Sequence, residues 1–62
     1  MTPNAERWAE ALAIERRYGD CASAHIARRI EALAMSGDTA GVDRWREIAE
    51  RYDRLRDQRV AN

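Results

Sequence analysis

Cys21 and His25 are the pair of residues in this sequence best suited to chemistry, and they stand four positions apart. On a helix this spacing places both side chains on one side, where they could reach the same metal ion. A structural zinc site needs four ligands and a catalytic one needs three, so Glu15 or Glu31 would have to complete the set. A Cys-His nucleophilic pair would also lack a residue to orient the histidine. We therefore predict no metal, no cofactor and no catalytic residue, and we do not expect an enzyme.

Glu15 is the second candidate, because it falls in the middle of the apolar face of the first expected helix. Burying an unpaired carboxylate is costly, so Glu15 needs a cationic or hydrogen-bonding partner. Arg29, at the edge of the next helix, is the best candidate, with Arg28 or a tyrosine hydroxyl as alternatives. A buried carboxyl would also suit a general acid or base, but we favour an ion pair that fixes how the helices pack.

The arginines invite a nucleic-acid interpretation, because Arg16-Arg17 and Arg28-Arg29 form doublets and six more arginines lie between residues 44 and 59. Eleven acids balance the eleven arginines, however, so the net basic charge that phosphate binding requires is missing. In the last third of the chain the acids precede arginines at helical pairing distance: Glu47 and Arg51, Glu50 and Arg54, Asp53 and Arg56. We expect no nucleic-acid partner and keep an arginine-rich regulator only as the alternative function.

Three helices must position these residues. Thr2 before Pro3 is a helix start, which predicts a first helix from about residue 3 to Tyr18 with a stop at Gly19. Asp20 is then expected to cap a second helix over residues 21 to 36. Gly37 ends that helix, and Asp38 caps a third one that runs to about Arg59. Two tight Gly-Asp turns therefore join three short amphipathic helices.

Apolar residues of the third helix recur three and four positions apart, as in a helix-packing seam: Trp45, Ile48, Tyr52 and Leu55. The second helix carries a narrower stripe that includes Ile26, Ile30 and Leu33. A short chain has difficulty burying the apolar stripes of all three helices. Apolar surface that stays exposed in this way marks an interface. We therefore expect a two-fold dimer, or docking on another protein, with those four residues of the third helix near or across the contact.

Gly41 stands in the opening turn of the third helix, where glycine is otherwise unfavourable. One interpretation is a close crossing with the second helix, in which the missing Cβ lets another backbone approach and Trp45 folds back over Leu33 or Ile30. The other is that the glycine is simply tolerated near a frayed helix end. The sequence does not distinguish them.

The chain resembles a family of short, uncharacterised bacterial proteins, a domain of unknown function, over nearly all of its length. The resemblance rests on "ERWAEAL", "RIEALA", "GDTAGVDRW" and "IAERYDRL". It implies a compact helical module and carries over no catalytic or ligand-binding residue.

The length of 62 residues allows a single small domain, which we take as residues 1–62, near the lower limit for independent folding. The sequence lacks a signal peptide and a membrane-spanning run, and its single cysteine cannot form an internal disulfide. We expect an all-α cytoplasmic protein, a small interaction module completed by dimerisation.

Overall fold

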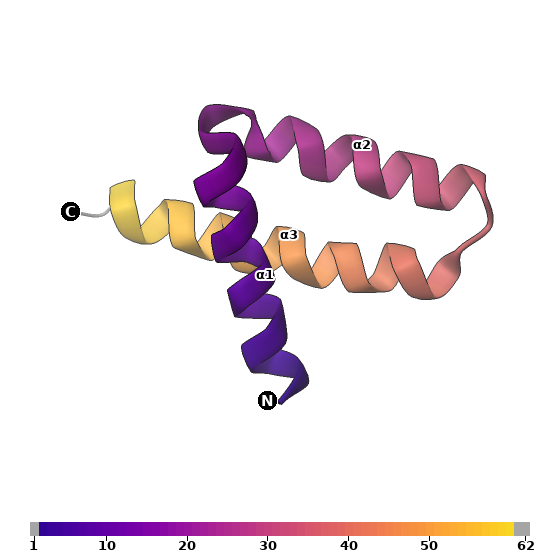
Figure 1. Ribbon diagram of the computed structural model, residues 1–62, viewed down its shortest axis with the longest axis horizontal. Helices are drawn as coiled ribbons and strands as arrows, with labels where there is room; N and C mark the ends of the chain where they lie inside the picture. The colour runs from indigo at the N-terminus through magenta and orange to yellow at the C-terminus, as the bar shows by residue number, and fades with distance from the viewer. Residues whose placement is uncertain (1, 61–62) are drawn as a thin grey trace.

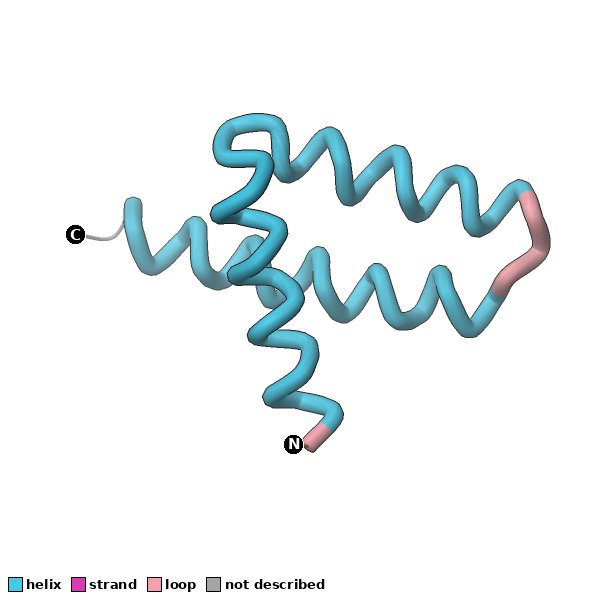
Figure 2. The backbone as a smooth tube through the Cα atoms, in the orientation of Figure 1, coloured by secondary structure: helices cyan, strands magenta, loops and turns pink. Residues whose placement is uncertain are grey.

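The computed structural model describes residues 2–60, which form three α-helices and one turn of 3-10 helix. Along the chain (Figure 1) these are α1 (Pro3–Tyr18), η1 (Gly19–Cys21), α2 (Ala22–Met35) and α3 (Thr39–Val60). The described residues contain no strand (Figure 2), so the predicted all-α class is confirmed.

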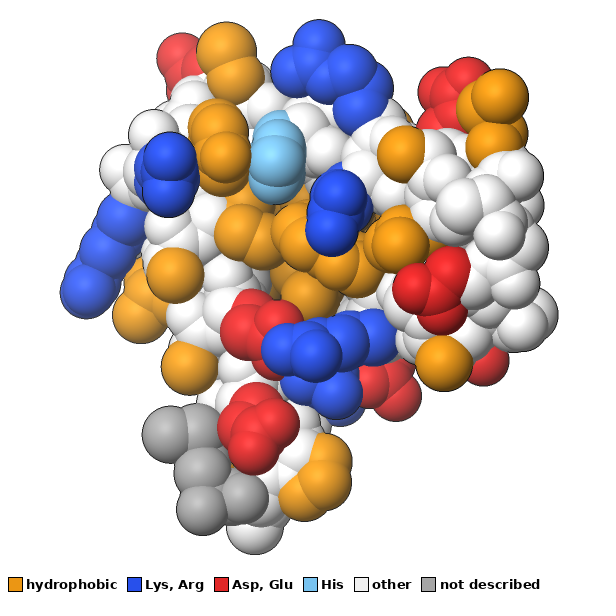
Figure 3. All heavy atoms as spheres, turned by 45° about the vertical axis from the view of Figure 1, so that its right-hand side comes forward, with side chains coloured by type: hydrophobic (Ala, Val, Ile, Leu, Met, Phe, Trp, Pro, Cys, Tyr) orange, Lys and Arg blue, Asp and Glu red, His pale blue; other side chains and the backbone are white. Residues whose placement is uncertain are grey.

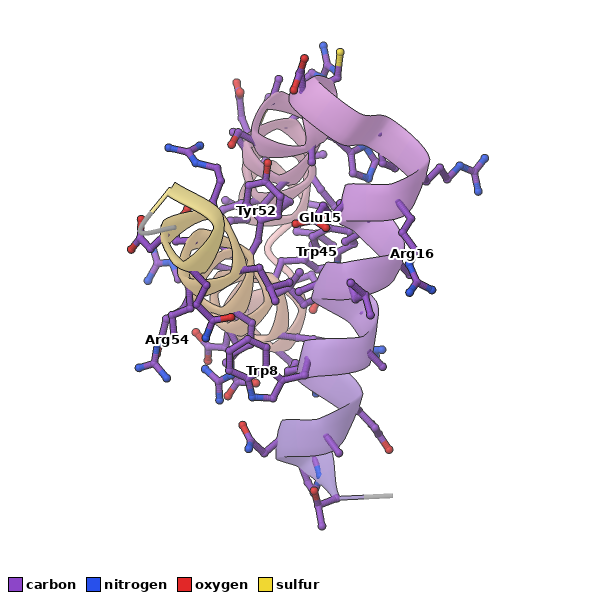
Figure 4. All side chains as sticks on the ribbon, turned by 90° about the vertical axis from the view of Figure 1, so that its left-hand side faces the viewer. Trp8, Glu15, Arg16, Trp45, Tyr52 and Arg54 are labelled. Carbon is purple, nitrogen blue, oxygen red and sulfur yellow. The ribbon has the colours of Figure 1, made fainter. Side chains whose placement is uncertain are left out.

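The helix α3 is the centre of the packing. It runs antiparallel to α2 in a hairpin, and α1 lies across one side of that hairpin (Figure 1). The helices α1 and α2 are joined at their ends and contact each other less than either contacts α3. The view along the hairpin in Figure 4 places α1 entirely to one side of it. Both other helices therefore depend on α3 for most of their buried surface.

The start of α1 is as predicted. The Thr2 hydroxyl accepts a hydrogen bond from the Ala5 N–H at 3.2 Å, and Pro3 occupies the first helical position. This satisfies one of the free N–H groups that every helix leaves at its first turn. The helix ends at Gly19, whose φ of 54° and ψ of −125° suit a residue without a side chain.

The predicted cap at Asp20 is wrong. Residues Gly19–Cys21 wind into η1, and the Ala22 N–H bonds back to the Gly19 carbonyl. The residue before α2 is Cys21, with a helical backbone (φ −90°, ψ 0°) and no capping side chain. An N-cap needs an extended backbone so that its side chain can reach forward, and the continuous winding of η1 into α2 does not provide one.

The second turn has the predicted form. Gly37 has a φ of 77°, the Asp38 N–H bonds to the Leu33 carbonyl at 3.0 Å, and the Gly37 N–H bonds to the Ala34 carbonyl at 3.1 Å. This pair of bonds is the glycine-dependent helix stop. The Asp38 carboxylate then accepts the Gly41 N–H at 2.9 Å, so Asp38 caps α3 as predicted.

Gly41 lies in close contact, but with side chains. A Cβ added to it would stand 2.7 Å from the Asp38 Oδ2 atom and 3.0 Å from the Leu33 Cδ2 atom. Of the two interpretations, the structure contains the close contact with the second helix, but side chains and not another backbone make it. The glycine leaves room for the capping carboxylate and for a leucine that reaches across from α2.

The core is small and mixes small with large side chains. Its buried apolar residues are Ala11, Ala22, Ile26, Ile48 and Tyr52. The two alanines allow helix axes to approach closely. Ile48 is fully buried and Tyr52 is 5 % exposed, so these two of the four predicted interface residues already lie in the core of the chain. Trp45 and Leu55 are half-buried against that core.

Candidate functional site

Cys21 and His25, the pair considered above as possible metal ligands or a nucleophilic pair, lie in different surroundings. Cys21 is exposed, whereas His25 is half-buried and its ring stacks on the Tyr18 ring, with 4.0 Å between centroids and 15° between planes. Over residues 2–60, no group of three or more histidine, cysteine, aspartate or glutamate side chains is arranged to hold a metal. His25 instead packs against two aromatic rings.

Three rings from three helices meet at this point. Tyr18 ends α1, His25 lies in the first half of α2, and Trp45 lies in the first half of α3. The His25 and Trp45 rings meet edge to face, with 5.8 Å between their centroids and 69° between their planes. Stacked and edge-to-face pairs of this kind are the favoured geometries for aromatic rings. We call these three residues the ring cluster.

Two exposed arginines lie over the ring cluster. The Arg17 guanidinium carbon is 5.6 Å from the Tyr18 centroid, and that of Arg29 is 5.8 Å from the Trp45 centroid. Both distances fall within the range of cation–π contacts. We call the ring cluster with Arg17 and Arg29 the corner face, because it lies where α1 meets the hairpin. Figure 3 shows hydrophobic side chains gathered on this side of the molecule, with the histidine beside them and arginines around them.

Glu15 is buried, at 8 % exposed, and it does not lack an interaction partner. Figure 4 shows it pointing from α1 toward the hairpin, whereas Arg16 points away. Glu15 lines a hollow with Arg16, Tyr52 and other residues of α1, η1 and α3. Burial of Glu15 is therefore confirmed, while Arg29, its predicted partner, has its guanidinium over the Trp45 ring.

Ion pairs join α1 to α3 away from the corner face. Arg7 donates to Glu47 at 2.9 Å and also bonds Glu10, which in turn accepts from Arg44 at 2.9 Å. The hydrogen bond to Glu47 raises the pKa of Arg7 above its ordinary value. The predicted Glu50–Arg54 pair forms at 2.8 Å. Glu47, predicted to pair with a residue on its own helix, bonds to α1 instead.

Arg51, the predicted partner of Glu47, packs against the beginning of α1. It donates to the Asn4 side-chain oxygen at 2.8 Å, and its guanidinium carbon is 5.9 Å from the Trp8 centroid. Both contacts join α3 to α1, so the sequence of α3 alone does not predict them.

The arginines of the two doublets lie outside the ion pairs described above. Among the described side chains, no salt bridge involves Arg16, Arg17, Arg28 or Arg29. All four are exposed. Two of these unpaired arginines lie in the last turn of α1 and two lie in the middle of α2.

A second feature is a shallow hollow of about 200 Å³ in the α2–α3 hairpin. Its walls are mainly apolar: Ser23, Ile26, Ala27, Ile30, Ala49, Tyr52 and Asp53. No residue of α1 lines it, so it is a separate surface from the corner face.

The ring cluster is the part of the site that sequence reasoning missed. Trp45 was placed on the apolar stripe of the third helix and Tyr18 at the end of the first helix, and His25 was considered only as a metal ligand or nucleophile. No signal within a single helix marks this cluster, because only the way the three helices meet brings the rings into contact.

Comparison with known proteins assigns the chain to a family. The model of a family described as "Family of unknown function (DUF6961)" matches residues 3–60. No curated protein and no solved structure matches the chain. None of the helices in the described part is both long enough and apolar enough to cross a membrane.

Proposed function

The chain belongs to this family of unknown function, and we propose that it is a small protein-interaction module. The observation that carries the proposal is the corner face, where exposed arginines lie over half-buried tyrosine and tryptophan rings. Tryptophan, tyrosine and arginine are the residues most enriched at the energetic centres of protein interfaces. Here they are collected on one surface from three helices.

The shape of the chain supports the same role. It exposes 4557 Å², whereas a compact monomer of 7.1 kDa would expose about 4,100 Å². Its radius of gyration is 11.8 Å, against about 10.6 Å for a compact domain of this length. The surplus surface is consistent with a fold that gains further burial from a partner.

Affinity capture tests the proposal. The tagged chain is used to capture partners from a lysate of its native cell, and the bound proteins are identified by mass spectrometry. We expect one captured protein to be present in a stoichiometric amount and to remain bound after nuclease treatment. A chain that captures no protein and does not self-associate would contradict the proposal.

Self-association is a second candidate, and the half-buried Leu55 and Trp45 favour it. Folding coupled to association makes the thermal midpoint rise with protein concentration. Sedimentation velocity and thermal melts over about a hundredfold dilution therefore test it. A monomer with a constant midpoint would reject the homodimer and leave docking on a different protein.

The nucleic-acid alternative draws on the unpaired arginine doublets, because arginines and aromatic rings also bind single strands by charge and stacking. The net charge of zero weighs against it. A gel shift with single- and double-stranded DNA and RNA separates the two functions. Low-micromolar affinity that falls steeply with salt would favour the nucleic acid.

A further inference from the structure

We propose that the corner face binds an acidic segment of another protein, and that this segment also carries a large hydrophobic side chain. The inference rests on the interaction role proposed above and names the chemistry of the partner. In this arrangement the carboxylates of the segment meet Arg17 and Arg29, and its hydrophobic side chain packs on the ring cluster.

The two arginines are presented in the way that carboxylate binding needs. Each guanidinium lies over a ring, at 5.6 Å for Arg17 and 5.8 Å for Arg29. A ring contact restrains a side chain that is otherwise long and flexible, so less entropy remains to be lost on binding. The planar guanidinium can then donate two N–H groups to one carboxylate.

The rings supply the apolar part of the surface. Tyr18, His25 and Trp45 are all half-buried, so each keeps part of its ring accessible while the rest is fixed by packing. Because the three rings come from three different helices, their relative positions depend on the whole fold. A bound hydrophobic side chain would meet a preformed surface, which lowers the entropic cost of association.

The positive charges of Arg17 and Arg29 favour an acidic partner. The acids that join α1 to α3 are already engaged, since Glu10 bonds both Arg7 and Arg44 and Glu47 bonds Arg7. Within the described part, Arg17 and Arg29 have no acid of this chain in a salt bridge. A segment that supplies carboxylates at this place is therefore complementary to the face, and such complementarity sets specificity and the rate of association.

Two other occupants fit less well. A second copy related by a two-fold axis would place the same face against itself, which would bring Arg17 and Arg29 of both copies together without acids between them. A nucleic acid gains most of its affinity from many phosphate contacts, whereas the corner face offers two arginines on a chain of zero net charge.

The doublets provide a matched pair of variants. Arg17→Glu with Arg29→Glu reverses the two charges over the rings. Arg16→Glu with Arg28→Glu reverses their immediate neighbours, on the same helices and with the same change in net charge. All four side chains are exposed, so both variants should keep the helical circular dichroism of the original chain. Each variant places one acid in the last turn of α1, so their melting midpoints should fall by similar small amounts.

The probe is a library of random short peptides, selected for binding to the original chain. We expect the enriched peptides to be net acidic and to share an aromatic or large aliphatic residue. For the best peptide, fluorescence anisotropy should show at least about tenfold weaker binding to the Arg17/Arg29 variant and less than about threefold weaker binding to the Arg16/Arg28 variant. Amide shifts on binding should map to Tyr18, His25 and Trp45.

Neutral or basic peptides, an enriched motif without a hydrophobic residue, or no enrichment at all would overturn the inference. Equal losses in the two variants would also overturn it, because they would indicate only a general charge effect. If affinity capture still finds a protein partner whose binding ignores Arg17 and Arg29, the interaction role stands and this docking face is wrong. Preference for single-stranded nucleic acid over every peptide would reject both.

Discussion

The two Gly-Asp turns contain the same pair of residues and connect their helices differently. At Gly37-Asp38 the glycine stops α2 and the aspartate caps α3 with a bond to the Gly41 N–H. At Gly19-Asp20 the glycine also has a positive φ, but the chain continues directly through η1 into α2 and the aspartate caps nothing. A shared dipeptide therefore fixes where a helix stops without fixing how the next one starts.

The two connections differ because each one positions the following helix differently. The second turn returns α3 antiparallel to α2 (Figure 1), and its three residues, which do not wind into a helical turn, hold a separate stop and cap. The first turn swings α2 away from α1 and must bring Ala22 into the core at once, where it is fully buried. Continuous winding through η1 does so, at the expense of the extended conformation that a capping residue needs.

The glycine positions should show the largest effect. Gly19, with a φ of 54° and ψ of −125°, occupies a region that residues with a side chain almost never adopt. We expect Gly19→Val to cost about 3 kcal/mol of unfolding free energy and Gly37→Val about 2 kcal/mol, because a β-branched residue resists a positive φ. Urea denaturation at one protein concentration measures both. A larger loss at Gly37 would reverse the comparison.

The aspartates should differ next. Asp38→Ala removes a cap from α3 and should lower the unfolding free energy by about 1 kcal/mol. Asp20→Ala removes an exposed side chain that caps no helix, and its effect should stay within about 0.5 kcal/mol. Equal losses in the same urea experiment would mean that Asp20 stabilises the first turn in some other way.

Gly41→Ala should give the smallest change. Alanine gains up to about 1 kcal/mol of helix propensity, but its Cβ must displace the Asp38 carboxylate and the Leu33 methyl. These opposing terms should leave the unfolding free energy within about 0.5 kcal/mol of the original. A cycle with Asp38→Ala sharpens the comparison, because alanine at residue 41 should be more favourable once the cap is gone. Independent effects of the two changes would argue against this contact.

Local signals predicted the helices well. Thr2 with Pro3, and Gly37 with Asp38, marked helix ends by bonds within a few residues, and the structure contains those bonds. Asp20 was misjudged because the same signal was read without the geometry of the junction. Helix assignment was therefore most reliable where one turn of the chain decides the outcome.

The candidate site was less predictable. Its rings come from three helices, and a helical wheel cannot state how different helices meet. The same limit applies to the predicted interface: Ile48 and Tyr52 were correctly placed on an apolar stripe, but α1 and α2 cover them within the chain. The faces of single helices could be derived from sequence, whereas their pairing required the fold.

The packing of α1 across α3 has a consequence for the order of folding. Its polar contacts join residues far apart in sequence, 40 positions for Arg7 with Glu47 and 47 for Asn4 with Arg51, whereas α2 and α3 are adjacent. Closing a short connection costs less chain entropy than closing a long one. We expect the hairpin to form first and α1 to dock last, which slower amide exchange in the hairpin than in α1 would support. Detachment of α1 would then transiently uncover the inner surface of the hairpin.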